Sequence, residues 1–228
     1  ACPHSRTCAA SSSGEQGRGG EVVVRAGMGR GGLVLHRASV AMGSGLRGRR
    51  LIMSKPRFCV HPLLMTDFLS IDLADTAATE ALGTRLAAIL RPGLALFLEG
   101  DLGAGKTTLV RGVLRGLGHT GKVKSPTFTL LESYAISSLN FPLYHFDFYR
   151  FADPDEFIEA GLDEYFGQTG PAGGVCLVEW PDKAGSHLPP PDLRIELAVA
   201  GDARRAQLSA CSEAGRACLE QLVQSGGR

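Results

Sequence analysis

The chain has 228 residues, of which 44% are hydrophobic, and a formal net charge of +1 at pH 7. This length predicts one well-buried domain with an appendage and argues against two large domains. No run approaches the roughly 18 consecutive apolar residues of a membrane-spanning helix, so we expect no contact with a membrane.

Charge is distributed unevenly along the chain. Residues 1–64 carry ten Lys and Arg against two Glu, whereas residues 65–228 carry fourteen basic and 21 acidic residues, a net charge of −7. An acidic domain argues against a broad nucleic-acid-binding face, so we expect contact with RNA to be indirect, through partner proteins. The six cysteines show neither CxxC spacing nor clustered histidines. This indicates a reduced, cytoplasmic setting without a zinc site.

Residues 1–64 are rich in Gly, Ser and Arg and show no sustained helical or strand period. We therefore predict a disordered basic extension at 1–64, followed by a single domain at 65–228. Three explanations of the extension stay open. The translation start is mis-set, with Met65 or Met53 as the true start; the segment is an Arg-rich organelle transit peptide; or it is a basic arm that binds RNA.

Periodicity predicts the elements of the first half of the domain. In chain order they are a strand at 68–73, a helix that Asp75 or Thr76 can cap and that extends to about Leu90, a buried strand at 94–98, and a helix at 106–117 with Gly118 as its C-cap. The helices have apolar residues three and four positions apart, and the second strand is a short apolar run.

The second half predicts a mixed set of elements. They are strands at 127–134 and 142–148, a short acidic helix that opens at Asp153-Pro154, a buried strand at 175–178, a hairpin of 193–199 and 205–209 around Gly201-Asp202, and a helix at about 213–223. The fold class that follows is α/β: a small P-loop NTPase-like three-layer sandwich with a central mixed sheet and a C-terminal β-hairpin plus helix.

Residues 100–107 have the sequence GDLGAGKT, which matches the phosphate-binding pattern G-x-x-x-x-G-K-[ST] between a predicted strand and a predicted helix. The glycines allow the backbone to turn its N–H groups toward phosphate oxygens. Lys106 can place a charge on the β- and γ-phosphates, and the Thr107 hydroxyl can ligate Mg²⁺. The loop predicts binding of a nucleoside triphosphate, ATP with Mg²⁺.

Two carboxylates follow predicted strands. Glu179 ends the 175–178 run, where a P-loop protein needs an acid for Mg²⁺, although a solvated strand-end acid has the same pattern. Asp147 ends the 142–148 strand and either orients the attacking water or caps the next turn. Trp180 next to Glu179 predicts an aromatic wall near the site. The segment 125–129, SPTFT, is either a switch-like γ-phosphate sensor or a β-prone stretch.

Four segments occur in an order that carries a family resemblance. They are GDLGAGKTT at 100–108, VKSPTFTL at 123–130, YHFDFYR at 144–150 and LVEWP at 177–181. Together they closely resemble the bacterial tRNA threonylcarbamoyladenosine biosynthesis ATPase family, over roughly residues 67–223. The resemblance implies a small ATPase that acts with two partners, a sugar-kinase-like catalytic subunit and its paralogue. These proteins place threonylcarbamoyl on adenosine 37 of tRNAs that read codons beginning with A.

The resemblance also implies roles for individual residues. Catalysis would rest on Lys106, Asp147 and Glu179, and the metal would be held by Thr107 and Glu179. The nucleotide would be held by Leu102, Gly103, Ala104, Gly105, Lys106, Thr107 and Thr108, with Thr79 near the adenine and Trp180 close by. Arg204 matches a family arginine only loosely.

Alternative functions stay open at this point. A P-loop small-molecule kinase usually adds a basic lid, yet only Lys183 lies between Glu179 and the hairpin. A GTP-dependent switch should contain N-K-x-D, which the chain lacks. A nucleotide-dependent interaction module with little turnover fits the lack of an evident arginine finger, and hydrolysis without partners is expected to be slow.

Overall fold

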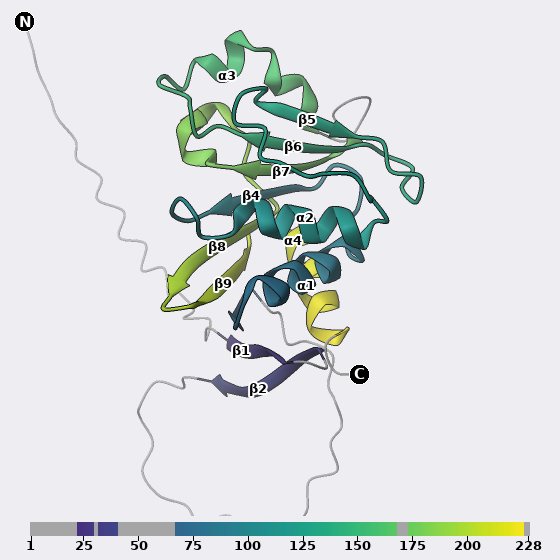
Figure 1. The fold of residues 1–228 in the computed structure, drawn as a ribbon, viewed down its shortest axis with the longest axis vertical. Helices are drawn as coiled ribbons and strands as arrows, with labels where there is room; N and C mark the ends of the chain where they lie inside the picture. The colour runs from purple at the N-terminus through teal and green to yellow at the C-terminus, as the bar shows by residue number, and fades with distance from the viewer. Residues whose placement is uncertain (1–21, 30–31, 41–66, 168–172, 226–228) are drawn as a thin grey trace, which may run out of the picture.

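A computed structural model describes residues 67–167 and 173–225, together with the backbone of 22–29 and 32–40. The strands are β1 (Val22–Gly29), β2 (Gly32–Val40), β3 (Phe68–Leu73), β4 (Ala95–Glu99), β5 (Leu131–Tyr134), β6 (Leu143–Asp147), β7 (Val175–Glu179), β8 (Leu193–Ala200) and β9 (Ala203–Ala210). They form one mixed nine-stranded sheet in the order β2-β1-β3-β9-β8-β4-β7-β6-β5, and seven of these strands lie within the predicted domain (Figure 1).

Helices cover both faces of this sheet. They are α1 (Thr76–Ala87), α2 (Lys106–Gly116), α3 (Glu156–Glu159) and α4 (Glu213–Gln224), with short 3₁₀ helices η1 (Leu162–Tyr165) and η3 (Pro181–His187). Asp75 caps α1 as predicted, because its carboxylate accepts a hydrogen bond from Ala78 N at 2.7 Å. In the described part of the chain no helix has the length and apolar character needed to cross a bilayer.

The centre of the sheet is a parallel group in which β4 pairs with β7 and β8, and β6 pairs with β7. Alternate side chains of β4 enter two separate cores: Leu96 and Leu98 pack with α1, α2 and α4, whereas Ala95 and Phe97 pack with α3, η1 and η3. Burial on both faces explains why these strands are continuous apolar runs. The predicted three-layer architecture and C-terminal hairpin plus helix are confirmed.

Several predicted boundaries are wrong. Helix α1 ends at Ala87 instead of Leu90, and α3 has only four residues and begins at Glu156 instead of Asp153. The predicted strand at 127–134 is confined to β5. Its first half is a turn, in which Leu130 has a φ of 62° and donates its N–H to the Pro126 carbonyl at 2.7 Å. A β-prone composition was overridden there by tertiary contacts.

The extension contains two strands that the sequence did not predict. Within the segment predicted to be disordered, β1 and β2 pair antiparallel, and β1 pairs in parallel with β3. Strand β3 pairs with β9 along one edge. Without β1, its other edge would expose unpaired backbone N–H and C=O groups, and β1 pairs with these groups. The rest of 1–64 lies outside the described residues, and the three explanations of the extension stay predictions.

Helices α1 and α2 approach closely at two glycines. A Cβ on Gly83 would collide with the Leu109 carbonyl oxygen and lie 2.7 Å from Val113 N, and a Cβ on Gly112 would collide with the Glu80 carbonyl oxygen. The Thr84 hydroxyl donates to the Gly112 carbonyl at 3.2 Å across the same contact. Gly83 therefore serves helix packing, which holds α2 against α1.

Replacing Gly83 with alanine should lower the free energy of unfolding by about 1–3 kcal/mol, because the added methyl group has no space between the helices. Denaturant titration of the full chain measures this change. Ala81→Ser, at an exposed position of the same helix, is the control and should change stability by less than about 0.5 kcal/mol. Equal stability of Gly83→Ala and the parent chain would contradict the close approach.

Candidate functional site

The loop between β4 and α2 turns sharply on its glycines. Gly100, Gly103 and Gly105 have φ angles of 124°, 81° and 110°, a region that other residues rarely adopt. A Cβ on Gly100 would also collide with the Leu197 carbonyl oxygen of β8. The glycines therefore allow the chain to pass directly from the buried end of β4 into the first turn of α2.

Lys106 is folded back over this loop. Its Nζ donates to the carbonyl oxygens of Gly100 and Asp101 at 2.6 and 3.0 Å and lies 3.8 Å from the centre of the Trp180 ring. Burial lowers the pKa of the Lys106 ammonium, and the nearby carboxylates, led by Glu179 and Asp147, oppose that shift. The ammonium group is thus held at the loop by neutral partners, which an anionic oxygen could replace.

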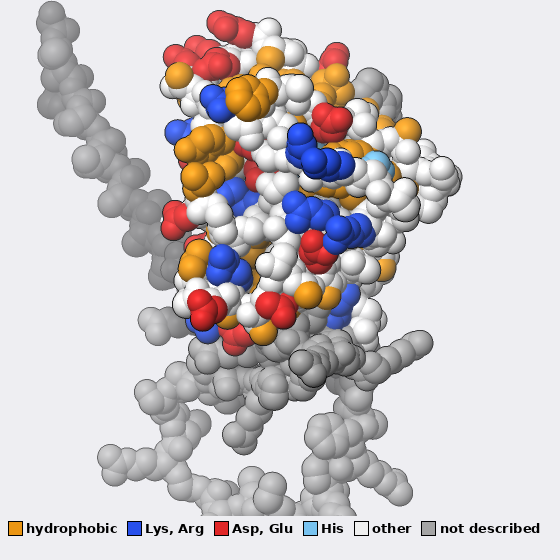
Figure 2. Space-filling model, in the orientation of Figure 1, with side chains coloured by type: hydrophobic (Ala, Val, Ile, Leu, Met, Phe, Trp, Pro, Cys, Tyr) orange, Lys and Arg blue, Asp and Glu red, His pale blue; other side chains and the backbone are white. Residues whose placement is uncertain are grey.

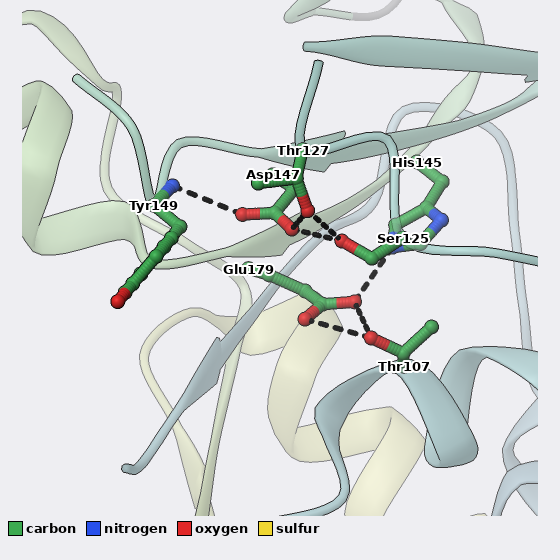
Figure 3. A network of polar contacts seen from close by, with 7 residues as sticks. All are labelled: Thr107, Ser125, Thr127, His145, Asp147, Tyr149 and Glu179. Carbon is green, nitrogen blue, oxygen red and sulfur yellow. Dashed lines mark hydrogen bonds and ion pairs between the residues drawn. The ribbon is translucent and has the colours of Figure 1, made fainter. Parts of the chain in front are cut away.

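A hydrogen-bonded group joins α2, β7 and β6 (Figure 3). The Thr107 hydroxyl lies 2.8 Å from Oε1 and 3.1 Å from Oε2 of Glu179, and His145 Nε2 lies 2.8 Å from the same Oε1. Glu179 is only 3% exposed and His145 is fully buried. The acid that the sequence placed at a strand end therefore lies against the loop threonine.

Asp147 holds the 125–127 segment against the site. Its Oδ2 accepts hydrogen bonds from the hydroxyls of Ser125 and Thr127, the latter at 2.8 Å, and its Oδ1 accepts from the Tyr149 N–H at 2.9 Å. In β6 and β7, Asp147 and Glu179 are directly paired in register. Both carboxylates consequently lie at the same edge of the sheet, beside the loop (Figure 3).

Two adjoining pockets contain the predicted binding residues. A groove of about 260 Å³ is lined by Leu102, Gly103, Gly105, Lys106, Thr107, Thr108, Ser125, Thr127, Asp147, Tyr149, Glu179 and Trp180. A smaller pocket of about 90 Å³ is lined by Asp75, Thr76, Thr79, Gly103, Ala104, Gly105, Thr108, Asp202 and Arg204. The pockets share Gly103, Gly105 and Thr108, so a ligand on the loop can extend from one into the other.

Thr79 and Trp180 line these pockets in ways that their residue types do not predict. The Thr79 hydroxyl donates to the Asp75 carbonyl at 3.2 Å, so Thr79 lines the small pocket with its hydroxyl already used. Trp180 has φ and ψ of 58° and 50°, a left-handed conformation that costs a non-glycine residue roughly 1–2 kcal/mol. This turn places the indole against Lys106 and 5.0 Å from the Tyr149 ring.

The sequence missed His145 and Tyr149. No catalytic role is predicted for His145, because its place in a strand is compatible with a side chain that faces the core. The available signal was strand alternation: positions 145 and 147 share one face of β6, and position 179 shares that face on β7. Tyr149 was predicted only as part of a motif, and it lines the groove because Asp147 holds its backbone N–H.

Comparison with known proteins identifies the family of this chain. The profile of the family described as threonylcarbamoyl adenosine biosynthesis protein TsaE matches residues 73–207. The chain belongs to the TsaE family. Proteins named tRNA threonylcarbamoyladenosine biosynthesis protein TsaE are 46% identical in Haemophilus influenzae, over 53% of this chain and 73% of the relative, and 49% identical in Bacillus subtilis, over 56% and 75%.

A solved structure supports the fold of this TsaE family member. The crystal structure of Bacillus subtilis YdiB superposes with a TM-score of 0.58 at 36% sequence identity, covering 69% of this chain and 95% of that chain. The expected P-loop NTPase-like fold class is therefore confirmed. The binding and catalytic roles assigned to single residues stay predictions.

The donor groups of the groove fit a magnesium ion together with a triphosphate. Hydroxyl and carboxylate oxygens such as those of Thr107 and Glu179 are the ligands that Mg²⁺ prefers. Four carboxylates lie close enough to Lys106 to oppose the lowering of its pKa. A bound triphosphate would add further negative charge, and this single lysine would leave most of that charge unbalanced. No cluster of three His, Cys, Asp or Glu side chains that could hold a metal occurs within 67–167 and 173–225.

Replacing Asp147 with alanine should destabilise the 125–130 segment by about 1–3 kcal/mol, because the partly buried hydroxyls of Ser125 and Thr127 lose their acceptor. Hydrogen exchange of the full chain, followed by mass spectrometry, should show faster exchange at 125–130 and at Tyr149, with β4 unchanged. The exposed Asp153→Ala serves as the control. Unchanged protection of 125–130 in Asp147→Ala would refute the anchoring role.

Proposed function

We propose that this chain is a Mg²⁺-dependent ATPase that works in forming threonylcarbamoyladenosine at position 37 of tRNAs that read codons beginning with A. The observation that carries the proposal is the contact between the Thr107 hydroxyl and the Glu179 carboxylate, directly beside Lys106 on the glycine loop. Family membership and the names of its relatives support the role in tRNA modification.

Lys106 is the residue proposed to grip the phosphates. Its present partners are two neutral carbonyl oxygens and an aromatic ring. A phosphate oxygen carries full negative charge and forms a stronger hydrogen bond with an ammonium. Lys106 would therefore move from the loop to the β- and γ-phosphates when ATP binds, while residues 102–108 surround them at the positive end of α2.

Thr107 and Glu179 are the residues proposed to serve the metal. The Thr107 oxygen keeps a free lone pair while its proton is donated to Glu179, so the same hydroxyl can act in both contacts. Mg²⁺, when bound, would supply positive charge to the phosphate oxygens during hydrolysis. The chain contributes a carboxylate and a hydroxyl that line the same groove and are hydrogen-bonded to each other.

Asp147 is the residue proposed to support the attacking water. Both of its oxygens are engaged, by Tyr149 N–H on one side and by two hydroxyls on the other. Oδ1 accepts only one hydrogen bond, so it keeps a lone pair that could orient a water. Among the described residues that line the groove there is no arginine. The lack of a lining arginine supports slow turnover in the isolated chain, which is also what the interaction-module alternative requires.

The small pocket is proposed to take the nucleoside. Thr79, on α1, and Arg204, on β9, both line it, and the shared residues Gly105 and Thr108 connect it to the phosphate groove. Trp180 lies on the other side of Lys106, in the groove, where it would contact the phosphate end. A phosphotransferase alternative needs a second substrate site and a basic lid, which the described residues near Glu179 do not supply beyond the exposed Lys183.

An apolar rim around the groove supports docking of partner proteins. Leu102, Phe128 and Tyr149 are 72%, 83% and 42% exposed, although they are large hydrophobic side chains. Arg150 stacks on Phe128 with its guanidinium carbon 4.1 Å from the ring centre. In the view of Figure 2, hydrophobic side chains show among polar ones, and acidic ones gather at the end of the molecule where α3 lies. We propose that the catalytic subunit and its paralogue contact this rim.

Replacing Lys106 with alanine should weaken ATP binding on the order of 100-fold, because a charged hydrogen bond contributes about 1.5–3 kcal/mol. Glu179→Gln should instead remove most of the Mg²⁺ dependence of binding. Calorimetric titration of the full chain with ATP, with and without Mg²⁺, measures both effects. Lys183→Ala is the matched control, since this lysine is exposed and does not line the groove. Equal affinity for GTP and ATP would argue against the ATPase assignment.

The same Lys106→Ala variant tests the biological role. In cells depleted of this protein, modified adenosine 37 should fall, and the wild-type chain should restore it while Lys106→Ala should not. Mass spectrometry of digested tRNA measures the modification. Unchanged modification after depletion would remove the role in tRNA and leave the nucleotide site intact.

Replacing Phe128 with alanine should weaken binding to the purified partner subunits by about tenfold or more, because the contact loses a buried aromatic side chain. ATP affinity of the isolated chain should stay unchanged, since Phe128 does not line the nucleotide groove. Ile158→Ala removes an exposed apolar side chain on α3 and is the control. The rim is the wrong surface if both variants bind the partners equally well.

A further inference from the structure

His145 is a buried polar side chain in the middle of β6, with no exposed surface. A polar ring in this position costs free energy unless its nitrogens are hydrogen-bonded. Nε2 lies 2.8 Å from Glu179 Oε1, whereas Nδ1 has no hydrogen-bond partner among the described residues. A residue that served packing alone would be more stable here as leucine, so the single contact with Glu179 accounts for a histidine.

The direction of this hydrogen bond follows from its acceptor. An ionised carboxylate only accepts hydrogen bonds, so His145 donates from Nε2 and carries its proton there. A proton on Nδ1 would be a buried donor without a partner. The ring is therefore placed as a donor to one particular oxygen of Glu179.

The two oxygens of Glu179 are consequently unequal. Oε1 receives His145 Nε2 and the shorter contact from the Thr107 hydroxyl, both at 2.8 Å, whereas Oε2 has only the 3.1 Å contact with that hydroxyl. Thr107 has a single proton to donate, and the shorter distance assigns it to Oε1. Oε2 is left as the oxygen available to a cation or its water in the groove (Figure 3).

We propose that His145 is a positioning residue: it anchors Oε1 of Glu179 so that Oε2 is directed to the magnesium ion of the bound nucleotide. This inference rests on the proposed function. Replacing a residue that hydrogen-bonds to a metal-binding side chain and orients it typically lowers metal affinity by about 10–100-fold. Nothing in this role requires His145 to touch nucleotide or metal.

Three substitutions separate positioning from packing. In His145→Gln the amide nitrogen reaches the place of Nε2 and keeps the donor, in His145→Asn it reaches only the place of Nδ1, and in His145→Leu there is no donor. Binding of a non-hydrolysable ATP analogue to the full chain is measured by calorimetry across Mg²⁺ concentrations and in EDTA. Thermal unfolding of each variant checks the fold.

The Leu and Asn variants should need about tenfold more Mg²⁺ for half-maximal binding, while binding in EDTA changes by less than about twofold. His145→Gln should stay within about threefold of wild type. In a Glu179→Gln background, His145→Leu should cause no further loss, since the ring acts only through that carboxylate. If His145→Leu does not fold, the comparison of Gln with Asn decides the question.

Two results would overturn the inference: a wild-type Mg²⁺ requirement in the folded Leu or Asn variant, or losses as large in His145→Gln as in these two. An additional loss in the Glu179→Gln background would show a structural role instead. A wild-type chain that binds the analogue without any effect of Mg²⁺ would refute the proposed function, and with it this inference, so the two failures are distinguishable.

Discussion

The hydrogen bond between the Thr107 hydroxyl and the Glu179 carboxylate joins the first turn of α2 to the end of β7. Each partner is fixed by a different constraint. Thr107 is placed by the glycine loop, which brings the chain from β4 straight into the helix, and Glu179 by parallel pairing of β7 with β4 and β6. Parallel strands end at the same edge of a sheet, so the loop, Glu179 and Asp147 meet there without any local sequence relationship.

Several features at this edge of the sheet lower the stability of the fold. Trp180 adopts a left-handed conformation, Lys106 is buried with a lowered pKa, and two carboxylates are only 3% exposed. Each feature opposes folding on its own. The surrounding sheet, whose central strands are buried on both faces, tolerates them. Strain and buried charge at one edge of a well-packed sheet are typical of a site that binds a charged ligand.

Charged and apolar side chains meet at the groove. Its carboxylates are hydrogen-bonded within the chain, and Leu102 and Tyr149, which also line it, are exposed together with Phe128. Phe128 follows Thr127, whose hydroxyl is held by Asp147, so one neighbouring residue joins Phe128 to a carboxylate of the groove. The proposed nucleotide site and the proposed partner surface are therefore adjacent in the chain.

The sequence by itself determined the features that depend on neighbouring residues. It predicted the glycine loop between strand and helix, the Asp75 cap and the hairpin around Gly201, because periodicity, capping and turn chemistry act over a few residues. Only the tertiary structure decided the rest. The role of His145, the turn that shortens β5 and the pairing of β1 with β3 depend on contacts between segments far apart in the chain, where hydrogen bonding and close packing override local propensity.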